Sequence, residues 1–151
     1  MEPKKMVIVE SDDTEDHWTR NGFNFLFYWK SKYPKFKISL FTIPNKTSRE
    51  MLELLEKHSD WIEFLVHGFT HSSNFECFDW DYDETKFLME SISPQYKKIF
   101  KAAGWTITPD LCGYPAREDQ LIYKDKQAVY KALKDLDFIV CDRHYNKPRR
   151  V

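Results

Sequence analysis

The sequence is poor in cysteine and has no long apolar run. Its 151 residues include three cysteines, Cys77, Cys112 and Cys141, which lie far apart and form no C-x-x-C pair. Such a set argues against a disulfide framework, a zinc ribbon or a redox motif, and favours a reducing compartment. The apolar segment 6–10 is too short for a signal peptide or a membrane span. We therefore expect a cytoplasmic protein without membrane contact.

The sequence also lacks an excess of charge of one sign. It has 23 basic and 24 acidic residues and a formal net charge of -1. Binding to a phosphate backbone usually needs a basic stripe that releases counterions, and none is evident, so nucleic acid is not an expected partner. With 42% hydrophobic residues and only four glycines, the composition excludes a disordered or linker-rich protein. The length fits one domain over residues 1–151.

What the sequence does contain is a regular alternation of two patterns. Apolar runs typical of strands occupy residues 6–10, 36–43, 61–66 and 138–142, and helical spacing occupies residues 17–32, 47–58, 84–103 and 126–137. This alternation predicts a parallel α/β arrangement, with helices covering the outside of a sheet or barrel. A short strand and an irregular loop are expected over 106–120.

Two helix starts and one break are visible in the sequence. Thr47 and Glu50 have the spacing of a capping box, which predicts that Thr47 caps the second helix. Asp83 is expected to cap the third helix. Pro94 disfavours helix at the residue before it, so the third helix is broken or kinked there.

Acids and histidines follow directly after three of the expected strands. These residues are Asp12 and Asp13, His67 and His71, and Asp142. In parallel α/β folds the working residues cluster on loops at the C-terminal ends of the strands. The three groups are therefore expected at one face of the molecule.

The spacing of His67 and His71 is typical of a pair of metal ligands. If the segment turns helically after its strand, both imidazoles lie on one side, within reach of one ion. The residue after the first histidine is Gly68 and not the glutamate of zincins, so a base must come from elsewhere. Asp12 and Asp13 provide one carboxylate to ligate the ion and one to contact bound water. The alternative for adjacent aspartates is a turn or a helix cap.

These segments together resemble a known family. The sequences VIVESDD (7–13), FTIP (41–44), LVHGFTH (65–71), KALKDL (131–136) and VCD (140–142) resemble the polysaccharide deacetylase superfamily, which is carbohydrate esterase family 4 of NodB type. The resemblance is strongest to short, divergent branches with an H-G-x-T-H motif, including virus-encoded ones. It implies a distorted (β/α) barrel with fewer than eight strands.

The resemblance also implies the roles of the site residues. By position, Asp12 corresponds to the catalytic base, and Asp13, His67 and His71 correspond to the ligands of one divalent metal ion, with zinc expected first. The implied activity is removal of acetyl groups from N-acetylated sugars or polysaccharide. An acetylated carbohydrate is thus the expected substrate.

Two segments compete for the family's third motif, which contains Arg or Lys, a proline and an aromatic residue. Residues 100–105 match more letters but lie at an expected helix end, whereas 113–117 are better placed between strand and helix. We favour the second segment, so Tyr114 and Arg117, together with Asp142, are the expected substrate-binding residues. Glu76 resembles an acidic position of the divergent branch, and the alternative is a solvated carboxylate.

The family's closing motif, a Leu and a His that acts as general acid, has no counterpart in the sequence. His144 lies nearby but matches no family position. The chain is then a fragment, a shortened relative or a degenerate one that lacks the last strands of the barrel. Three functions remain open: a sugar deacetylase, a binding module for sugar or protein that retains only the metal site, and a hydrolase of another amide or ester.

Overall fold

A computed structural model describes residues 10–14, 16–72, 76–103 and 128–141, with the backbone alone for residues 10–14 and 16–22. Its elements, in chain order, are β1 (Glu10–Thr14), α1 (Asp16–Lys32), β2 (Ile38–Thr42), the 3₁₀ turn η1 (Pro44–Lys46), α2 (Arg49–Glu56), β3 (Ile62–His67), the 3₁₀ turn η2 (Glu76–Asp79), α3 (Tyr82–Glu90), β4 (Ile99–Lys101), α4 (Ala128–Asp135) and β5 (Ile139–Cys141). Each helix within these ranges is too short or too polar to cross a lipid bilayer.

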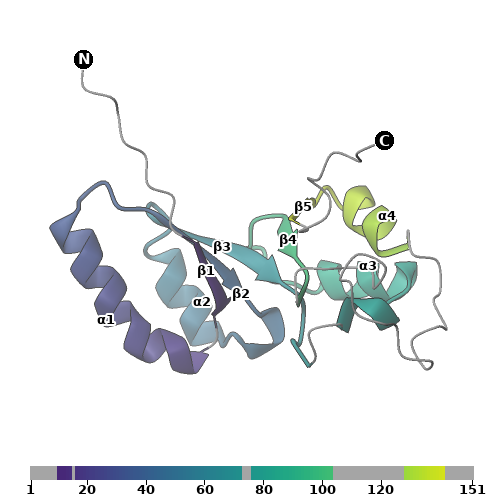
Figure 1. The fold of residues 1–151 in the computed structure, drawn as a ribbon, viewed down its shortest axis with the longest axis horizontal. Coiled ribbons are helices and arrows are strands. Elements are labelled where there is room, and N and C mark those ends of the chain that lie inside the picture. Colours follow the sequence, from purple (N-terminus) through teal and green to yellow (C-terminus); the bar gives the residue numbers. More distant parts are fainter. Residues whose placement is uncertain (1–9, 15, 73–75, 104–127, 142–151) are drawn as a thin grey trace, which may run out of the picture.

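The five strands form one parallel sheet in which spatial order follows chain order, from β1 to β5. Each crossover therefore moves one strand further in the same direction. Because such crossovers are right-handed, they bring their helices to one face of the sheet, as in part of a (β/α) barrel. Figure 1 shows α1 and α2 along the β1–β3 part of the sheet, and α3 packed beside α4 near β4 and β5. The predicted parallel α/β arrangement is confirmed.

The core lies between the central strands and the helices. In β3 all residues except Glu63 are buried, which is the pattern of a strand covered on both faces. The strands contribute Leu40, Val66 and Phe100, none of which is exposed to solvent. Helix α2 adds Met51 and Leu55, one turn apart on its buried face. The continuous apolar strands are thus explained by burial from both sides.

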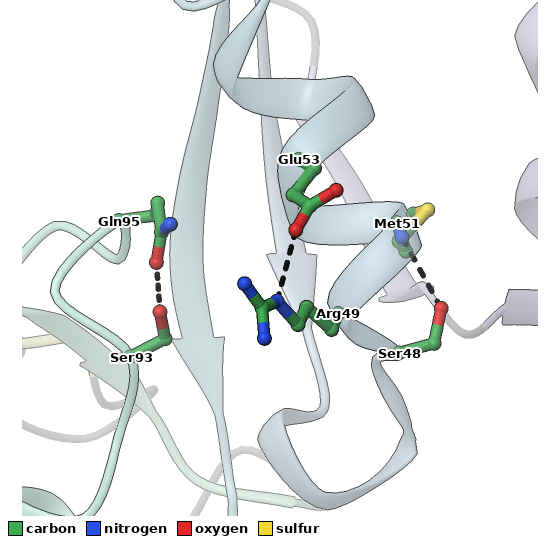
Figure 2. Close-up of polar contacts among 6 residues, drawn as sticks. All are labelled: Ser48, Arg49, Met51, Glu53, Ser93 and Gln95. Carbon is green, nitrogen blue, oxygen red and sulfur yellow. Dashed lines mark hydrogen bonds and ion pairs between the residues drawn. The ribbon is translucent and has the colours of Figure 1, made fainter.

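Helix α2 begins one residue later than predicted. The side chain of Ser48 accepts a hydrogen bond from the Met51 amide at 3.2 Å and caps the helix (Figure 2). The hydroxyl of Thr47 instead donates to the Ile43 carbonyl at 2.8 Å, within the preceding turn. The capping box predicted from Thr47 and Glu50 is therefore wrong, because the Thr47 hydroxyl bonds to the preceding turn and Ser48 caps the helix.

Helix α3 is much shorter than predicted, and its cap is Asp81, which accepts from the Glu84 amide at 2.9 Å. The prediction of Asp83 as cap was wrong. The helix ends at Glu90, so the break before Pro94 is confirmed. In the turn that follows, the side chains of Ser93 and Gln95 contact one another (Figure 2).

Residues 99–101, which were predicted to be helical, form β4. They pair with both β3 and β5, and Phe100 is fully buried between them. Strand β1 also differs from its prediction, because it extends to Thr14 through pairing with β2. In both segments the sheet supplies backbone partners that a local pattern cannot reveal.

Candidate metal centre

His67 is the last residue of β3, and only 2% of it is exposed. Its Nδ1 lies 3.2 Å from the carbonyl oxygen of Lys101, its neighbour in the sheet. A carbonyl oxygen can only accept a hydrogen bond, so Nδ1 is a nitrogen that carries a proton, and in the neutral form of the ring Nε2 would be the metal-binding nitrogen. Metal-binding histidines are usually anchored in this way, through the ring nitrogen that does not bind the metal.

The ring of His71 lies beside that of His67. The two ring centroids are 5.0 Å apart, and the ring planes are inclined by 50°. With a Zn–N distance of about 2.1 Å and tetrahedral angles, two imidazole ligands of one ion have centroids roughly 5 Å apart. The histidine pair therefore fits a shared metal ion.

The chain between the two histidines is not helical, so the helical turn on which the spacing argument was conditional does not form. After β3 it forms an irregular bend in which Gly68 has φ +55° and His71 has φ +50°. Both values lie in the left-handed region, which glycine enters readily and other residues rarely do. The two imidazoles meet because the loop folds around another side chain, and not because of helical spacing.

That side chain is Glu76, the first residue of η2, and only 6% of it is exposed. Its Oε1 accepts from the Phe69 amide at 2.8 Å. Its Oε2 accepts from the Thr70 amide at 3.0 Å, the Thr70 hydroxyl at 2.6 Å and the His71 amide at 3.0 Å. The alternative of a solvated carboxylate is therefore wrong, because this carboxylate is buried and accepts from four donors.

Gly68 completes the loop around Glu76. A Cβ atom at this position would overlap the Glu76 carboxylate, and the positive φ would strain any other residue. The Gly68 amide donates to the Lys101 carbonyl at 2.8 Å, which ties the start of the loop to β4. The loop therefore needs glycine at position 68 for two reasons: the Glu76 carboxylate lies where a Cβ atom would be, and the backbone has a positive φ.

The two aspartates lie in β1 at an irregularity of the sheet. Ser11 pairs with Leu40 and Thr14 pairs with Thr42, so β1 advances by three residues where β2 advances by two. The backbone of Asp12 and Asp13 therefore lies opposite the single residue between Leu40 and Thr42. This region is two strands away from β3, at the same C-terminal edge of the sheet as the histidines.

Of the three predicted ligands, the structure describes the side chains of His67 and His71, and for Asp13 it describes the backbone alone. Among all the side chains that the structure describes there is no group of three His, Cys, Asp or Glu that could hold a metal. His67 and His71 are brought together, and the backbone of Asp12 and Asp13 runs along the same sheet edge. The predicted substrate residues Tyr114, Arg117 and Asp142 lie outside the described ranges.

Lys101 is a further charged residue at this edge, and it is fully buried. Its Nζ lies 4.8 Å from the ring centre of Phe41, the residue of β2 that faces the irregularity of β1. The Phe41 ring is in turn 6.4 Å from the ring of His67. A buried lysine side chain thus lies among the strand ends that carry the predicted site residues.

No family model and no curated protein matches the sequence. A solved structure, that of the Xyl-CE4 domain of a multidomain xylanase from the hindgut metagenome of Trinervitermes trinervoides, is similar with a TM-score of 0.50. The sequences are 14% identical, and the likeness covers 90% of this chain and 86% of that chain.

The fold is similar to that of a CE4 domain. At 14% identity the likeness concerns the fold and does not extend to individual residues. It agrees with the family that the sequence resembles, since CE4 denotes carbohydrate esterase family 4. The likeness therefore concerns the α/β fold, with its parallel strands in chain order.

Two residues that shape this centre could not be assigned to it from the sequence: Glu76 had no predicted role, and Lys101 belonged to the less favoured of two candidates for the third motif. Glu76 lies five positions after His71, a spacing that matches no helical or strand pattern. Lys101 fell within a segment predicted as helix. An acid shortly after the histidine motif was the one available signal for Glu76, and it did not indicate burial.

Proposed function

We propose that this chain is a metal-dependent hydrolase that removes acetyl groups from N-acetylated sugars or polysaccharide. The observation that carries the proposal is the pairing of the His67 and His71 rings, with Nδ1 of His67 anchored on a backbone carbonyl. The likeness of the fold to a CE4 domain supports the same chemistry. We also propose that the fold is the distorted (β/α) barrel that the resemblance implies, and that the bound metal is zinc.

Asp13, His67 and His71 are the proposed ligands. Two neutral imidazoles and one carboxylate leave open positions for water and substrate, as in catalytic rather than structural zinc sites. A divalent ion bound there would lower the pKa of a water molecule and polarise the acyl carbonyl. In a regular strand Asp12 and Asp13 would point to opposite faces, and an extra residue in the strand relaxes that rule. The irregularity thus supports two roles for two adjacent carboxylates at one site.

Asp12 is the proposed general base. It accepts a proton from water as the water oxygen attacks the acetyl carbon, and a tetrahedral oxyanion forms. The C–N bond then breaks, the amine nitrogen takes up one proton, and acetic acid leaves with the second proton of the water and ionises in solution. The proton that Asp12 has accepted balances the one that the leaving nitrogen needs. Tyr114, Arg117 and Asp142 remain the residues proposed to contact substrate.

Phe100 and Lys101 are the proposed counterpart of the family's third motif. Their strand pairs with the strand that ends in His67, so Lys101 lies at the edge where the aspartates also lie. A buried ammonium group is stabilised by nearby carboxylates. This position favours residues 100–105 as the third motif, whereas the sequence alone had favoured 113–117. Tyr114 and Arg117 are then proposed to contact substrate from outside that motif.

Metal analysis is the first test. The purified chain should contain about one zinc ion per chain after equilibration, as expected for a mononuclear site. His67→Ala and Asp13→Ala should each lose it, because each removes one of three ligands. Stoichiometric metal in both variants would contradict the proposed site.

Acetate release from chito-oligosaccharides is the second test. Asp12→Asn should keep the metal and lower the rate by roughly 10²- to 10⁴-fold, the usual contribution of a general base. If the metal-loaded wild type releases no acetate with any divalent ion tried, the chain is instead a binding module that retains the metal site.

A further inference from the structure

The two histidines of the proposed metal site are held in different ways. His67 is buried at the end of β3, and its ring is anchored on the Lys101 carbonyl. His71 is only partly buried and lies in a loop, with its backbone in the left-handed region. The position of the His71 ring therefore depends on whatever holds this loop.

The loop is held by Glu76. Three consecutive amides, those of Phe69, Thr70 and His71, all donate to its carboxylate, and the Thr70 hydroxyl donates as well. The acceptor is buried, so water competes poorly for these donors. Hydrogen bonds to an ionised acceptor are also stronger than those between neutral groups.

We infer that Glu76 is a positioning residue that sets the His71 side of the metal site before any metal binds. This inference rests on the proposed function, because it takes His71 to be a ligand. Glu76 acts through the backbone of the loop and does not itself contact the ion. A pre-formed site binds metal more tightly, because ordering of the ligands does not then oppose binding.

The distribution of the hydrogen bonds explains why a carboxylate is needed. Every one of the four contacts requires an acceptor, with one contact on Oε1 and three on Oε2. A glutamine offers one acceptor oxygen and an NH₂ group, so at least one loop donor would face another donor. Glu76→Gln is therefore a nearly isosteric change: it removes one acceptor oxygen and the negative charge, and it keeps the volume of the side chain.

Zinc affinity of the metal-free protein, measured by competition with a chromophoric chelator, tests the inference. Glu76→Gln should weaken binding roughly 10- to 100-fold, as is usual for groups that orient metal ligands. The matched control is Glu63→Gln, the same change at the exposed acid of β3, the strand that ends in His67. It should leave the affinity within about twofold of wild type.

The visible absorption spectrum of the cobalt-loaded protein provides a second measurement, because it reports the ligand geometry and not the stability of the fold. Glu76→Gln should change the band at saturating cobalt, and Glu63→Gln should not. Affinity within twofold of wild type together with an unchanged band in Glu76→Gln would overturn the inference.

Amide hydrogen exchange of the metal-free protein separates the two proposals. In Glu76→Gln the amides of Phe69, Thr70 and His71 should exchange faster, while that of Gly68, which donates to Lys101, should be unchanged. If the wild type binds no metal, the proposed function fails, and exchange still decides whether Glu76 organises the loop. If these three amides exchange at the wild-type rate in Glu76→Gln, the inference that Glu76 organises the loop is overturned as well.

Thr70→Val serves if Glu76→Gln does not fold. It removes the hydroxyl donor to Glu76 and leaves all three amide donors in place. A several-fold loss of zinc affinity is expected, smaller than that of a folded Glu76 variant. An affinity equal to that of wild type would count against the inference.

Discussion

Gly68 shows how strongly a single residue can constrain this centre. Its φ of +55° requires the left-handed region, and the carboxylate of Glu76 occupies the space that a Cβ atom would need. The two requirements have one origin, because the loop must turn sharply to bring three amides onto one carboxylate. The conformation and the hydrogen bonds therefore depend on each other.

Gly68→Ala should lower both stability and metal affinity. The backbone alone costs about 1–2 kcal/mol for an alanine in the left-handed region, and displacement of Glu76 adds to this. The free energy of unfolding from urea titration and the zinc affinity measure the two effects. Glu56→Ala, at the exposed end of helix α2, is the control and should change stability by less than about 0.5 kcal/mol. Equal stability of Gly68→Ala and wild type would contradict the close approach of Glu76.

At the scale of elements, a polar contact joins α3 to α4. The Tyr82 hydroxyl, at the start of α3, donates to Oδ2 of Asp135 at 2.9 Å. This hydrogen bond raises the pKa of Tyr82 above its ordinary value of 10.0, with smaller contributions from desolvation and from the negative charge of Asp135. The folded chain therefore keeps the phenol proton to a higher pH than the unfolded chain.

This difference predicts how stability changes in alkaline solution. Below pH 10 the contribution of the contact is complete, and above pH 10 the unfolded chain binds fewer protons than the folded one. The free energy of unfolding therefore falls as the pH rises through the folded pKa of Tyr82. Tyr82→Phe should show a shallower fall than wild type in urea titrations below and above pH 10.

Tyr33→Phe is the control for this measurement. It removes an exposed phenol without touching the contact between α3 and α4. The fall in stability of Tyr33→Phe should follow that of wild type. If Tyr82→Phe and wild type lose stability in parallel, the contact with Asp135 does not shift the titration of Tyr82.

At the scale of the whole molecule, the proposed metal would connect strands that do not pair directly. Asp13 belongs to β1, whereas His67 and His71 belong to β3 and the loop after it, with β2 between the two strands. An ion bound by all three would therefore tie the first strand to the centre of the sheet. Unfolding of the domain would require release of the metal.

Metal removal should accordingly lower the stability of the whole domain. At free zinc 100-fold above the dissociation constant, binding stabilises the folded state by about 2.7 kcal/mol. Thermal unfolding with zinc and with a chelator should show a higher Tm for the loaded form. In His71→Ala the two Tm values should coincide. A wild-type Tm that does not respond to zinc would contradict binding to the folded state.

The parts of the molecule that could be predicted from sequence are those set by local periodicity. The α/β class, the helix of α1 and the strands β2 and β3 follow from apolar spacing, since burial of one face or both imposes that spacing. The histidine pair could be predicted because motif spacing and strand-end position are both local. The two rings do lie side by side, but the chain does not make the helical turn that the spacing argument assumed.

Contacts between distant segments decided the rest. Residues 99–101 became a strand because β3 and β5 supply their backbone partners, and Ser48 replaced Thr47 as helix cap because Thr47 bonds to the turn before it. Glu76 is buried because the loop after β3 folds around its carboxylate and donates hydrogen bonds to it. Sequence by itself thus determined the kinds of elements and the ligand candidates, whereas hydrogen bonds formed only in the folded chain decided how those candidates are held.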